Sequence, residues 1–181
     1  MSSLYEIETK YKVDDFLEIK RRLHVIGAKK IKSVHEKDIY YQHPCRDFVN
    51  TDEALRIRIE NDKNFFLTYK GPRESFYPKK RIEINLVFDN LNNLKKLLKV
   101  LGFKEVAAIE KNREYWDLQP WKITLDNVKD LGYYIELEYQ GDRYEKKLFD
   151  DIIKKIGLNE KKYIRESYLE IYLAKKKYNF A

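Results

Sequence analysis

The residues with the clearest chemical potential lie near the N-terminus, in Glu6-Ile7-Glu8-Thr9-Lys10. Side chains alternate between the two faces of a β-strand, so Glu6, Glu8 and Lys10 would share one face of an extended segment. The two carboxylates would then lie about 7 Å apart, with an ammonium group next in line. Such a row can hold a divalent metal ion and an anion beside it, or it can simply face water. One strand does not distinguish between these interpretations.

The same alternation of charged residues returns in several later segments. Arg56 and Arg58 share one face of a short extended run, and Glu136 and Glu138 share one face of another. The other charged residues that fit the same pattern are Lys70, Arg81, Glu83, Lys111, Arg113 and Asp126. A charged face that recurs in this way is better explained by a common site than by several unrelated surfaces.

Eight segments have strand character, and four have helical periodicity. Short turns join most of the strands, which favours an antiparallel sheet, and about eight strands can close into a barrel without free edges. The apolar stripe of each helix must be buried against the Ile/Leu/Tyr face of the sheet, so the charged face should line the inside. We therefore predict an α+β fold, a closed eight-stranded antiparallel β-barrel or tunnel with a charged interior and helices packed outside. The predicted strands are 4–12, 28–42, 54–60, 65–70, 81–88, 110–116, 122–128 and 133–139, and the predicted helices are 14–26, 91–101, 144–156 and 163–175.

A barrel interior with a dozen charged groups limits what the protein can do. Burying an isolated ion costs several kcal/mol, so these groups must be hydrated, paired, or bound to a metal or a ligand. Carboxylates without nearby His or Cys suit Mg²⁺ or Mn²⁺, and a ring of Lys and Arg suits a chain of phosphates. Together they predict a site for a metal-bound polyphosphate.

Composition adds weaker limits. The 181 residues are expected to form a single domain, 1–181, and the formal charge of +7 suits an anionic partner. Cys45 is the only cysteine, so a reducing, cytoplasmic compartment is expected, and no stretch of the sequence has the length and apolarity of a membrane span.

The sequence resembles the CYTH proteins, also called triphosphate tunnel metalloenzymes. Glu6-Ile7-Glu8-Thr9-Lys10 matches the ExExK signature of that family. The resemblance extends over essentially the whole chain and is closest to the class IV adenylyl cyclase branch. The further segments that carry it are 43–48, 51–58, 67–72, 125–128, 131–138 and Ser167-Tyr168.

The resemblance implies a role for each charged residue. Glu6, Glu8, Glu136 and Glu138 would hold Mg²⁺ or Mn²⁺, and Glu83 and Asp126 would complete an acidic wall, with Glu6, Glu8, Lys10, Glu83 and Asp126 as the catalytic set. One position departs from the family pattern, because Asn85 stands where a third acidic residue is often found, which weakens a second metal site there. The predicted triphosphate ligands are Lys10, Arg56, Arg58, Lys70, Arg81, Lys111 and Arg113.

Three functions remain open from the sequence. A triphosphatase needs an oriented water, whereas an adenylyl cyclase must also fix the ribose and base of ATP, and no sequence element indicates an adenine pocket. We therefore predict a metal-dependent triphosphatase acting on inorganic triphosphate and on nucleoside triphosphates, with adenylyl cyclase as the alternative. A non-enzymatic binder of polyphosphate, nucleotides or RNA is the third possibility. For RNA the relevant residues would be Lys161, Lys162 and Lys175–Lys177, but such runs are usually solvated helix ends, so neither nucleic acid nor membrane is expected as a partner. The resemblance also implies a homodimer.

Overall fold

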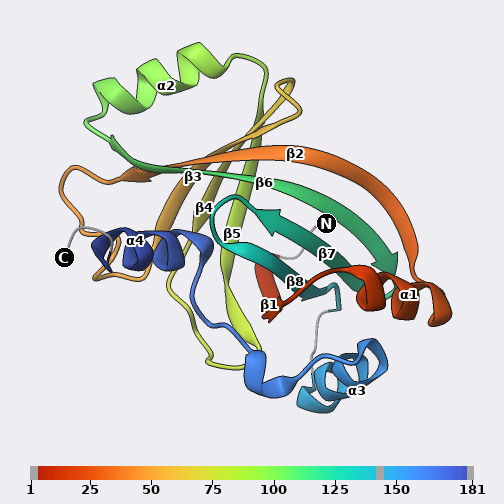
Figure 1. The fold of residues 1–181 in the computed structure, drawn as a ribbon. Helices are drawn as coiled ribbons and strands as arrows, with labels where there is room; N and C mark the ends of the chain where they lie inside the picture. Colours follow the sequence, from red (N-terminus) through yellow and green to blue (C-terminus); the bar gives the residue numbers. More distant parts are fainter. Residues whose placement is uncertain (1–3, 142–144, 179–181) are drawn as a thin grey trace.

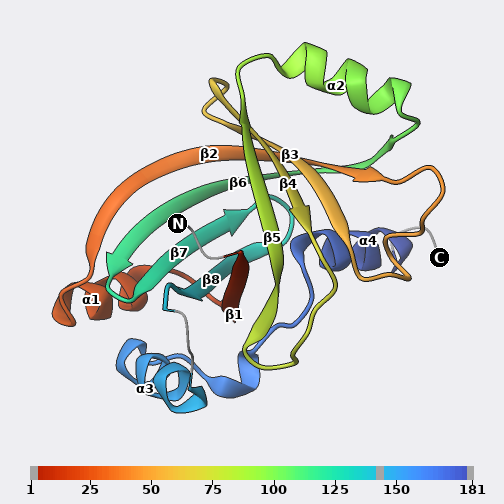
Figure 2. The same cartoon turned by 180° about the vertical axis from the view of Figure 1, so that it is seen from behind.

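The computed structural model describes residues 4–141 and 145–178, and within them eight strands form one barrel with helices around it (Figures 1 and 2). The helices are α1 (Leu17–Val25), α2 (Leu91–Val100), α3 (Lys146–Ile156), α4 (Tyr168–Tyr178) and the 3₁₀ turn η1 (Glu160–Lys162). The strands are β1 (Tyr5–Val13), β2 (Lys29–Gln42), β3 (Ala54–Glu60), β4 (Asn64–Lys70), β5 (Lys79–Phe88), β6 (Lys104–Leu118), β7 (Trp121–Val128) and β8 (Gly132–Tyr139).

The sheet closes on itself in the order β1-β5-β4-β3-β2-β6-β7-β8, and every neighbouring pair is antiparallel. β1 joins the two ends of the sheet, because it pairs with β5 on one side and β8 on the other. The register places Glu6 opposite Arg81 and Glu8 opposite Glu138. The predicted closed antiparallel barrel is confirmed, and closure brings the first strand between two other charged strands.

The apolar faces of the strands lie outside the barrel, where the helices cover them. Leu23 of α1 and Ile153 of α3 belong to one cluster with Ile123 and Leu137 of the sheet. Leu94 and Leu98 of α2 belong to a second cluster over β2 and β3. Trp116 and Trp121 lie in the first cluster, so they are core residues. Because the outer face holds the core, the charged face is left to line the interior.

The last helix differs from its predicted position. It begins at Tyr168 rather than near residue 163, because the preceding backbone bonds to the barrel. Tyr163 forms an isolated bridge with Tyr11, and the Ile164 amide donates to the Lys10 carbonyl at 2.8 Å. This extended segment connects η1 to α4. Helix α4 itself lies beside the loop between β2 and β3 (Figures 1 and 2).

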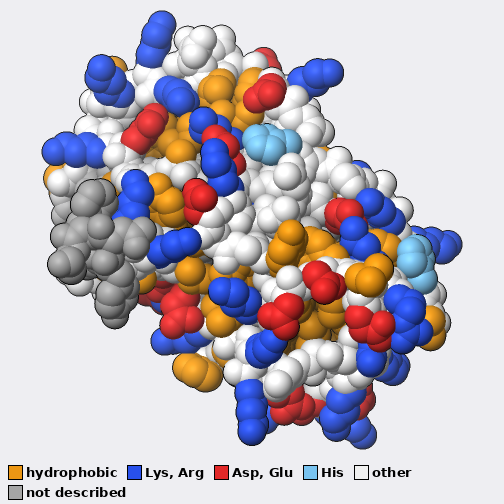
Figure 3. All heavy atoms as spheres, viewed as in Figure 1, with side chains coloured by type: hydrophobic (Ala, Val, Ile, Leu, Met, Phe, Trp, Pro, Cys, Tyr) orange, Lys and Arg blue, Asp and Glu red, His pale blue; other side chains and the backbone are white. Residues whose placement is uncertain are grey.

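The outer surface shows no continuous basic stripe on the face drawn in Figure 3, where Lys and Arg alternate with Asp and Glu. Of the lysines considered for RNA binding, Lys162 pairs with Asp14 at 3.0 Å and Lys175 donates to the Asp130 carbonyl; the side chain of Lys177 lies outside the described residues. No helix within residues 4–141 and 145–178 has the length and apolarity needed to cross a membrane.

Candidate active site

The barrel encloses a cavity of about 1110 Å³. The predicted site residues converge there from β1, β3, β4, β5, β6 and β8, which lie far apart in the sequence. All of them except Asp126 line this cavity: Glu6, Glu8, Lys10, Arg56, Arg58, Lys70, Arg81, Glu83, Lys111, Arg113, Glu136 and Glu138. The alternation of charged residues therefore becomes one internal surface.

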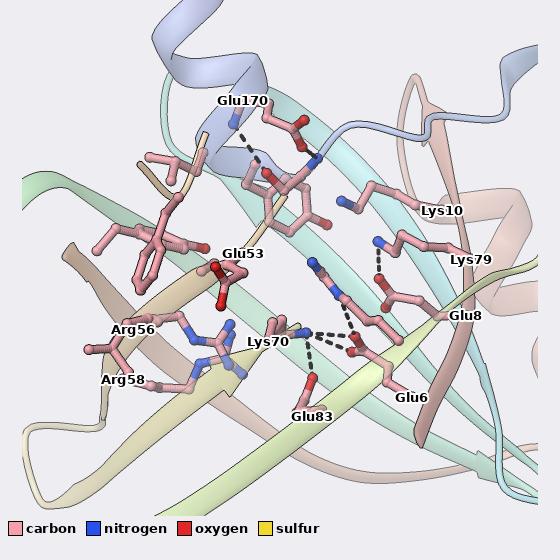
Figure 4. Close-up of a pocket in the computed structure, with 18 of the residues that line it drawn as sticks. Glu6, Glu8, Lys10, Glu53, Arg56, Arg58, Lys70, Lys79, Glu83 and Glu170 are labelled. Carbon is pink, nitrogen blue, oxygen red and sulfur yellow. Dashed lines mark hydrogen bonds and ion pairs between the residues drawn. The ribbon is translucent and has the colours of Figure 1, made fainter. Parts of the chain in front are cut away.

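On the wall formed by β4, β5, β1 and β8, acids and bases both face the cavity (Figure 4). The Lys70 ammonium lies 2.8 Å from both Glu6 oxygens and 2.5 Å from Glu83. Arg81 contacts Glu6 at 3.4 Å, and Glu8 pairs with Lys79. Each of these ion pairs borders open space, so an incoming anion or cation can exchange with one partner.

On the opposite wall, formed by β3, β2, β6 and β7, the acids lie behind the bases. Asp38 accepts from Arg58 at 2.7 and 2.8 Å and from Lys111 at 3.1 Å, and Glu36 lies 3.3 Å from Lys111. Glu36 and Asp38 are 0% and 1% exposed and do not line the cavity, whereas Arg58 and Lys111 do. The buried acids thus fix their cations from behind while leaving them at the cavity surface.

Asp126 plays the same part on β7. Its carboxylate is 0% exposed, accepts from Arg113 Nε at 2.6 Å, and accepts from the Tyr168 hydroxyl at 2.8 Å. Arg113 also donates to Glu136 at 2.6 Å, and Glu136 lies 3.4 Å from the Lys10 ammonium. Asp126, predicted to be catalytic, is therefore held away from the cavity, and Glu136 lies in an ion-pair network with Arg113 and Lys10.

The electrostatics follow this division. Burial alone would raise the pKa of Glu36, but Lys111, Arg58 and Arg113 together lower it to about 2. Burial would also raise the pKa of Asp38, but the positive charges of Arg56, Arg58 and Lys111 hold it well below its usual range. Burial and the neighbouring Lys79 lower the pKa of Lys10 to about 8. Glu36 and Asp38 are therefore firmly ionised, whereas Lys10 loses its proton near pH 8.

The carboxylates Glu6, Glu8 and Glu138 provide the test of whether a divalent cation suits the site. Glu8 and Glu138 stand directly opposite each other on adjacent strands, an unfavourable arrangement for two like charges. Burial, and next the charge of Glu6, raise the pKa of Glu138, with a smaller contribution from Glu8. Their oxygen-only chemistry and mutual repulsion fit a hard cation such as Mg²⁺ or Mn²⁺.

These carboxylates are engaged with lysines rather than gathered around one point. Across residues 4–141 and 145–178, no group of three or more His, Cys, Asp or Glu side chains has an arrangement that could hold a metal ion. Glu6 and Glu8 bind Lys70 and Lys79 instead, while Glu138 accepts only from Gln140, at 2.8 Å, among the contacts of the described chain. Glu138 is therefore the carboxylate of the three with the weakest existing partner.

Asn85, at the position that departs from the family pattern, serves as a hydrogen-bonding bridge. It donates to Glu83 at 2.7 Å and accepts from the Thr68 hydroxyl at 2.6 Å. Its carbonyl is thus used within the wall, and its amide orients Glu83 toward Lys70.

Several residues in or next to the candidate site escaped the sequence analysis. Glu36 and Asp38 alternate in the predicted strand 28–42 as the other acids do, so the signal was present. Lys79 begins β5 two residues before the predicted strand, and its pairing with Glu8 depends on barrel register. Arg73 belongs to a loop and had no pattern that could identify it.

Comparison with known proteins places this geometry in a family. The CYTH domain model matches residues 4–168. A Methanocaldococcus jannaschii protein named "Putative adenylate cyclase MJ0240" is 40% identical over 173 residues, 93% of this chain and 98% of that protein. "Adenylate cyclase CyaB" of Aeromonas hydrophila is 24% identical over 91% of this chain and 86% of its own.

Solved structures agree with the fold. The PH1819 protein of Pyrococcus horikoshii superposes with a TM-score of 0.83 and 38% identity, covering 94% of this chain and 99% of that one. A protein of Hippeastrum, HpAC1, superposes with a TM-score of 0.68 and 15% identity over 94% of this chain and 95% of its own. It is described as a "putative adenylyl cyclase" that "reveals a dominant" triphosphatase activity.

Proposed function

Because the chain belongs to the CYTH domain family, we propose that it is a divalent-metal-dependent triphosphatase, a single CYTH domain spanning residues 1–181. Its proposed substrates are inorganic triphosphate and nucleoside triphosphates. The observation that carries the proposal is the barrel cavity in which cations from two opposite walls converge. Arg56, Arg58, Lys111 and Arg113 lie on one wall, and Lys10, Lys70, Lys79 and Arg81 lie on the other.

The chain's own residues would divide the work between the two walls. The wall with buried acids presents Arg58, Lys111 and Arg113 in fixed positions, which suits electrostatic stabilisation of phosphate oxygens. On the other wall, Lys70 and Lys79 would leave Glu6 and Glu8 to contact phosphate. Once free of these lysines, Glu6 and Glu8 would move toward Glu138, and the three carboxylates, with Glu136 at their border, would hold Mg²⁺ or Mn²⁺. When bound, such an ion neutralises phosphate charge and activates water.

Adenylyl cyclase is the second candidate, and one observation favours it. The cavity continues past the cations to an apolar mouth beside α4, lined by Val49, Val106, Leu169 and Leu173. A bare triphosphate would leave this region empty, whereas a nucleotide could place its base there. The names of two relatives point the same way. Hydrolysis remains the first proposal, because it does not require a fixed ribose.

The decisive experiment separates products. Purified protein is incubated with tripolyphosphate or ATP, with Mg²⁺ or Mn²⁺, and the products are resolved by ion-exchange chromatography. Orthophosphate from tripolyphosphate supports the triphosphatase, and cyclic AMP with pyrophosphate from ATP identifies a cyclase. Binding of RNA that weakens with salt and survives Glu6→Ala, without turnover, would reject both in favour of a binding protein.

A further inference from the structure

Arg73, in the loop between β4 and β5, joins two segments at the mouth of the cavity. Its side chain is 10% exposed. Its backbone amide and its Nε both donate to Asp52, at 3.0 and 2.8 Å, in the loop between β2 and β3. Its other guanidinium nitrogens donate to Glu170 of α4 at 3.0 and 3.4 Å and to the Arg165 carbonyl at 3.2 Å. Asp52 and Glu170 line the cavity, and Arg73 connects them from outside it.

Glu170 also fixes the first turn of α4. Its carboxylate accepts from the Ser167 amide at 2.7 Å, and its own amide donates to the Ser167 hydroxyl at 3.2 Å. This reciprocal pair is a capping box, which defines where a helix begins. Arg73 therefore holds a rigid turn, residues 165–170, rather than one flexible side chain.

The same turn carries two groups into the charged site. The Glu166 carbonyl accepts from the Lys10 ammonium at 3.0 Å, and the Tyr168 ring lies with its centroid 4.1 Å from that ammonium. The Tyr168 hydroxyl donates to Asp126, which orients Arg113. A shift of this turn would consequently move the immediate surroundings of Lys10 and of Asp126 together.

We propose that Arg73 is a positioning residue for the tunnel site. By bridging Asp52 and Glu170, it holds the turn of residues 165–170 in place. The turn then positions Lys10 through the Glu166 carbonyl and Asp126 through the Tyr168 hydroxyl. The inference rests on the proposed triphosphate chemistry for its effect on turnover, but the ordering of the turn can be measured without it. The forked shape of the guanidinium matters, because separate nitrogens reach Asp52, Glu170 and the Arg165 carbonyl, whereas the three N–H donors of a lysine ammonium all leave from one nitrogen.

The experiment combines hydrogen exchange with kinetics. Amide exchange over residues 164–174 is followed by mass spectrometry in the wild type, Arg73→Ala and Arg73→Lys. The kcat for tripolyphosphate is measured in the same three proteins. It is also measured in Tyr168→Phe and in the double variant that carries Arg73→Ala and Tyr168→Phe. The matched control is Arg165→Ala, since the Arg165 side chain is exposed and lies over Phe76. Glu170→Gln serves as a second disruption of the bridge if Arg73→Ala does not fold.

We expect Arg73→Ala to speed exchange of the turn about tenfold and to lower kcat about tenfold, in keeping with the cost of small misplacements in active sites. Arg73→Lys should recover only part of both, and Arg165→Ala should change neither. Because Arg73 acts in part through the Tyr168 hydroxyl, the loss in the double variant should be smaller than the product of the two single losses.

Unchanged exchange in Arg73→Ala would overturn the proposal, and so would kinetic losses that multiply in the double variant. If the wild type does not hydrolyse tripolyphosphate at all, the proposed function fails, and the exchange result alone then decides whether Arg73 positions the turn.

Discussion

The two walls of the tunnel carry similar numbers of charges but arrange them differently. On the β3–β2–β6–β7 wall, Glu36, Asp38 and Asp126 are buried behind the cations that they orient. On the β4–β5–β1–β8 wall, Glu6 and Glu8 lie beside their cations, and all of them border the cavity. The first arrangement makes a preorganised anion surface, and the second makes a surface whose ion pairs can rearrange around a metal and a substrate.

This difference separates stability from function. Removing a buried acid takes away negative charge on the side of its cations that water does not reach, whereas removing an acid at the cavity leaves its partner open to solvent or ligand. Substitutions on the two walls should therefore have opposite signatures, with large losses of folding free energy on one and large losses of turnover on the other.

The largest effect is expected from Glu8→Gln, on the wall that can rearrange. It removes a negative charge beside Glu138 while keeping the shape of the side chain, so kcat should fall about 10³-fold, comparable to the loss of one strong electrostatic contact in an active site. Steady-state kinetics with tripolyphosphate and Mg²⁺ measures it. Glu53→Gln is the control, because Glu53 also lines the cavity but is engaged by Thr51 and Tyr69 at 2.6 and 2.5 Å. Equal activity in wild type and Glu8→Gln would remove Glu8 from the metal-binding set.

Next in size is Asp38→Asn, on the wall with buried acids. It leaves Arg58 and Lys111 with Glu36 as their one remaining shared carboxylate, so the free energy of unfolding should fall by about 3 kcal/mol. Urea denaturation followed by circular dichroism measures it. Glu83→Gln, whose carboxylate borders the cavity, should cost less than half as much. Equal losses in the two variants would mean that the walls do not differ in the way described.

This contrast also explains what the sequence could predict. Alternation of Glu6, Glu8 and Lys10 with apolar residues determines which face of β1 points inward, and the same rule applied to β3 and β8, so the barrel and most of its lining were predictable. The depth of a charged group within the wall could not be predicted, because Asp126 and Glu136 both occupy inward positions of their strands. Only the side chains around them, Arg113 on the adjacent strand β6 and Tyr168 of α4, decide that one is covered and the other is not.

A smaller effect concerns the charge of Lys10. Its pKa is lowered to about 8, so the ammonium form is nearly complete below pH 7 and is lost as the pH rises through 8. If the ammonium binds phosphate, affinity for tripolyphosphate without added metal should fall about tenfold between pH 7 and 9, because about nine tenths of Lys10 is then neutral. Isothermal titration calorimetry measures the affinity, and Lys10→Arg, which stays charged, accounts for titration of the ligand itself. Parallel pH profiles in the two proteins would show that Lys10 does not carry the dependence.

The smallest effect tests the wall with buried acids without removing a charge. The Tyr115 hydroxyl donates to Glu36 at 2.7 Å, and Glu36 keeps Lys111 and Arg58 as ion partners when that bond is lost. Tyr115→Phe should therefore lower the free energy of unfolding by about 1 kcal/mol, the usual value of one hydrogen bond to a buried group. Tyr41→Phe is the matched control, because the Tyr41 hydroxyl donates to the more exposed Glu105. Tyr115 itself lines the cavity, yet its hydroxyl is committed to the acid behind the wall, so affinity for tripolyphosphate should stay within twofold of the wild type. A large loss of affinity with no change in stability would instead assign the hydroxyl to the ligand, and the buried acid would then be less isolated from the cavity than its exposure indicates.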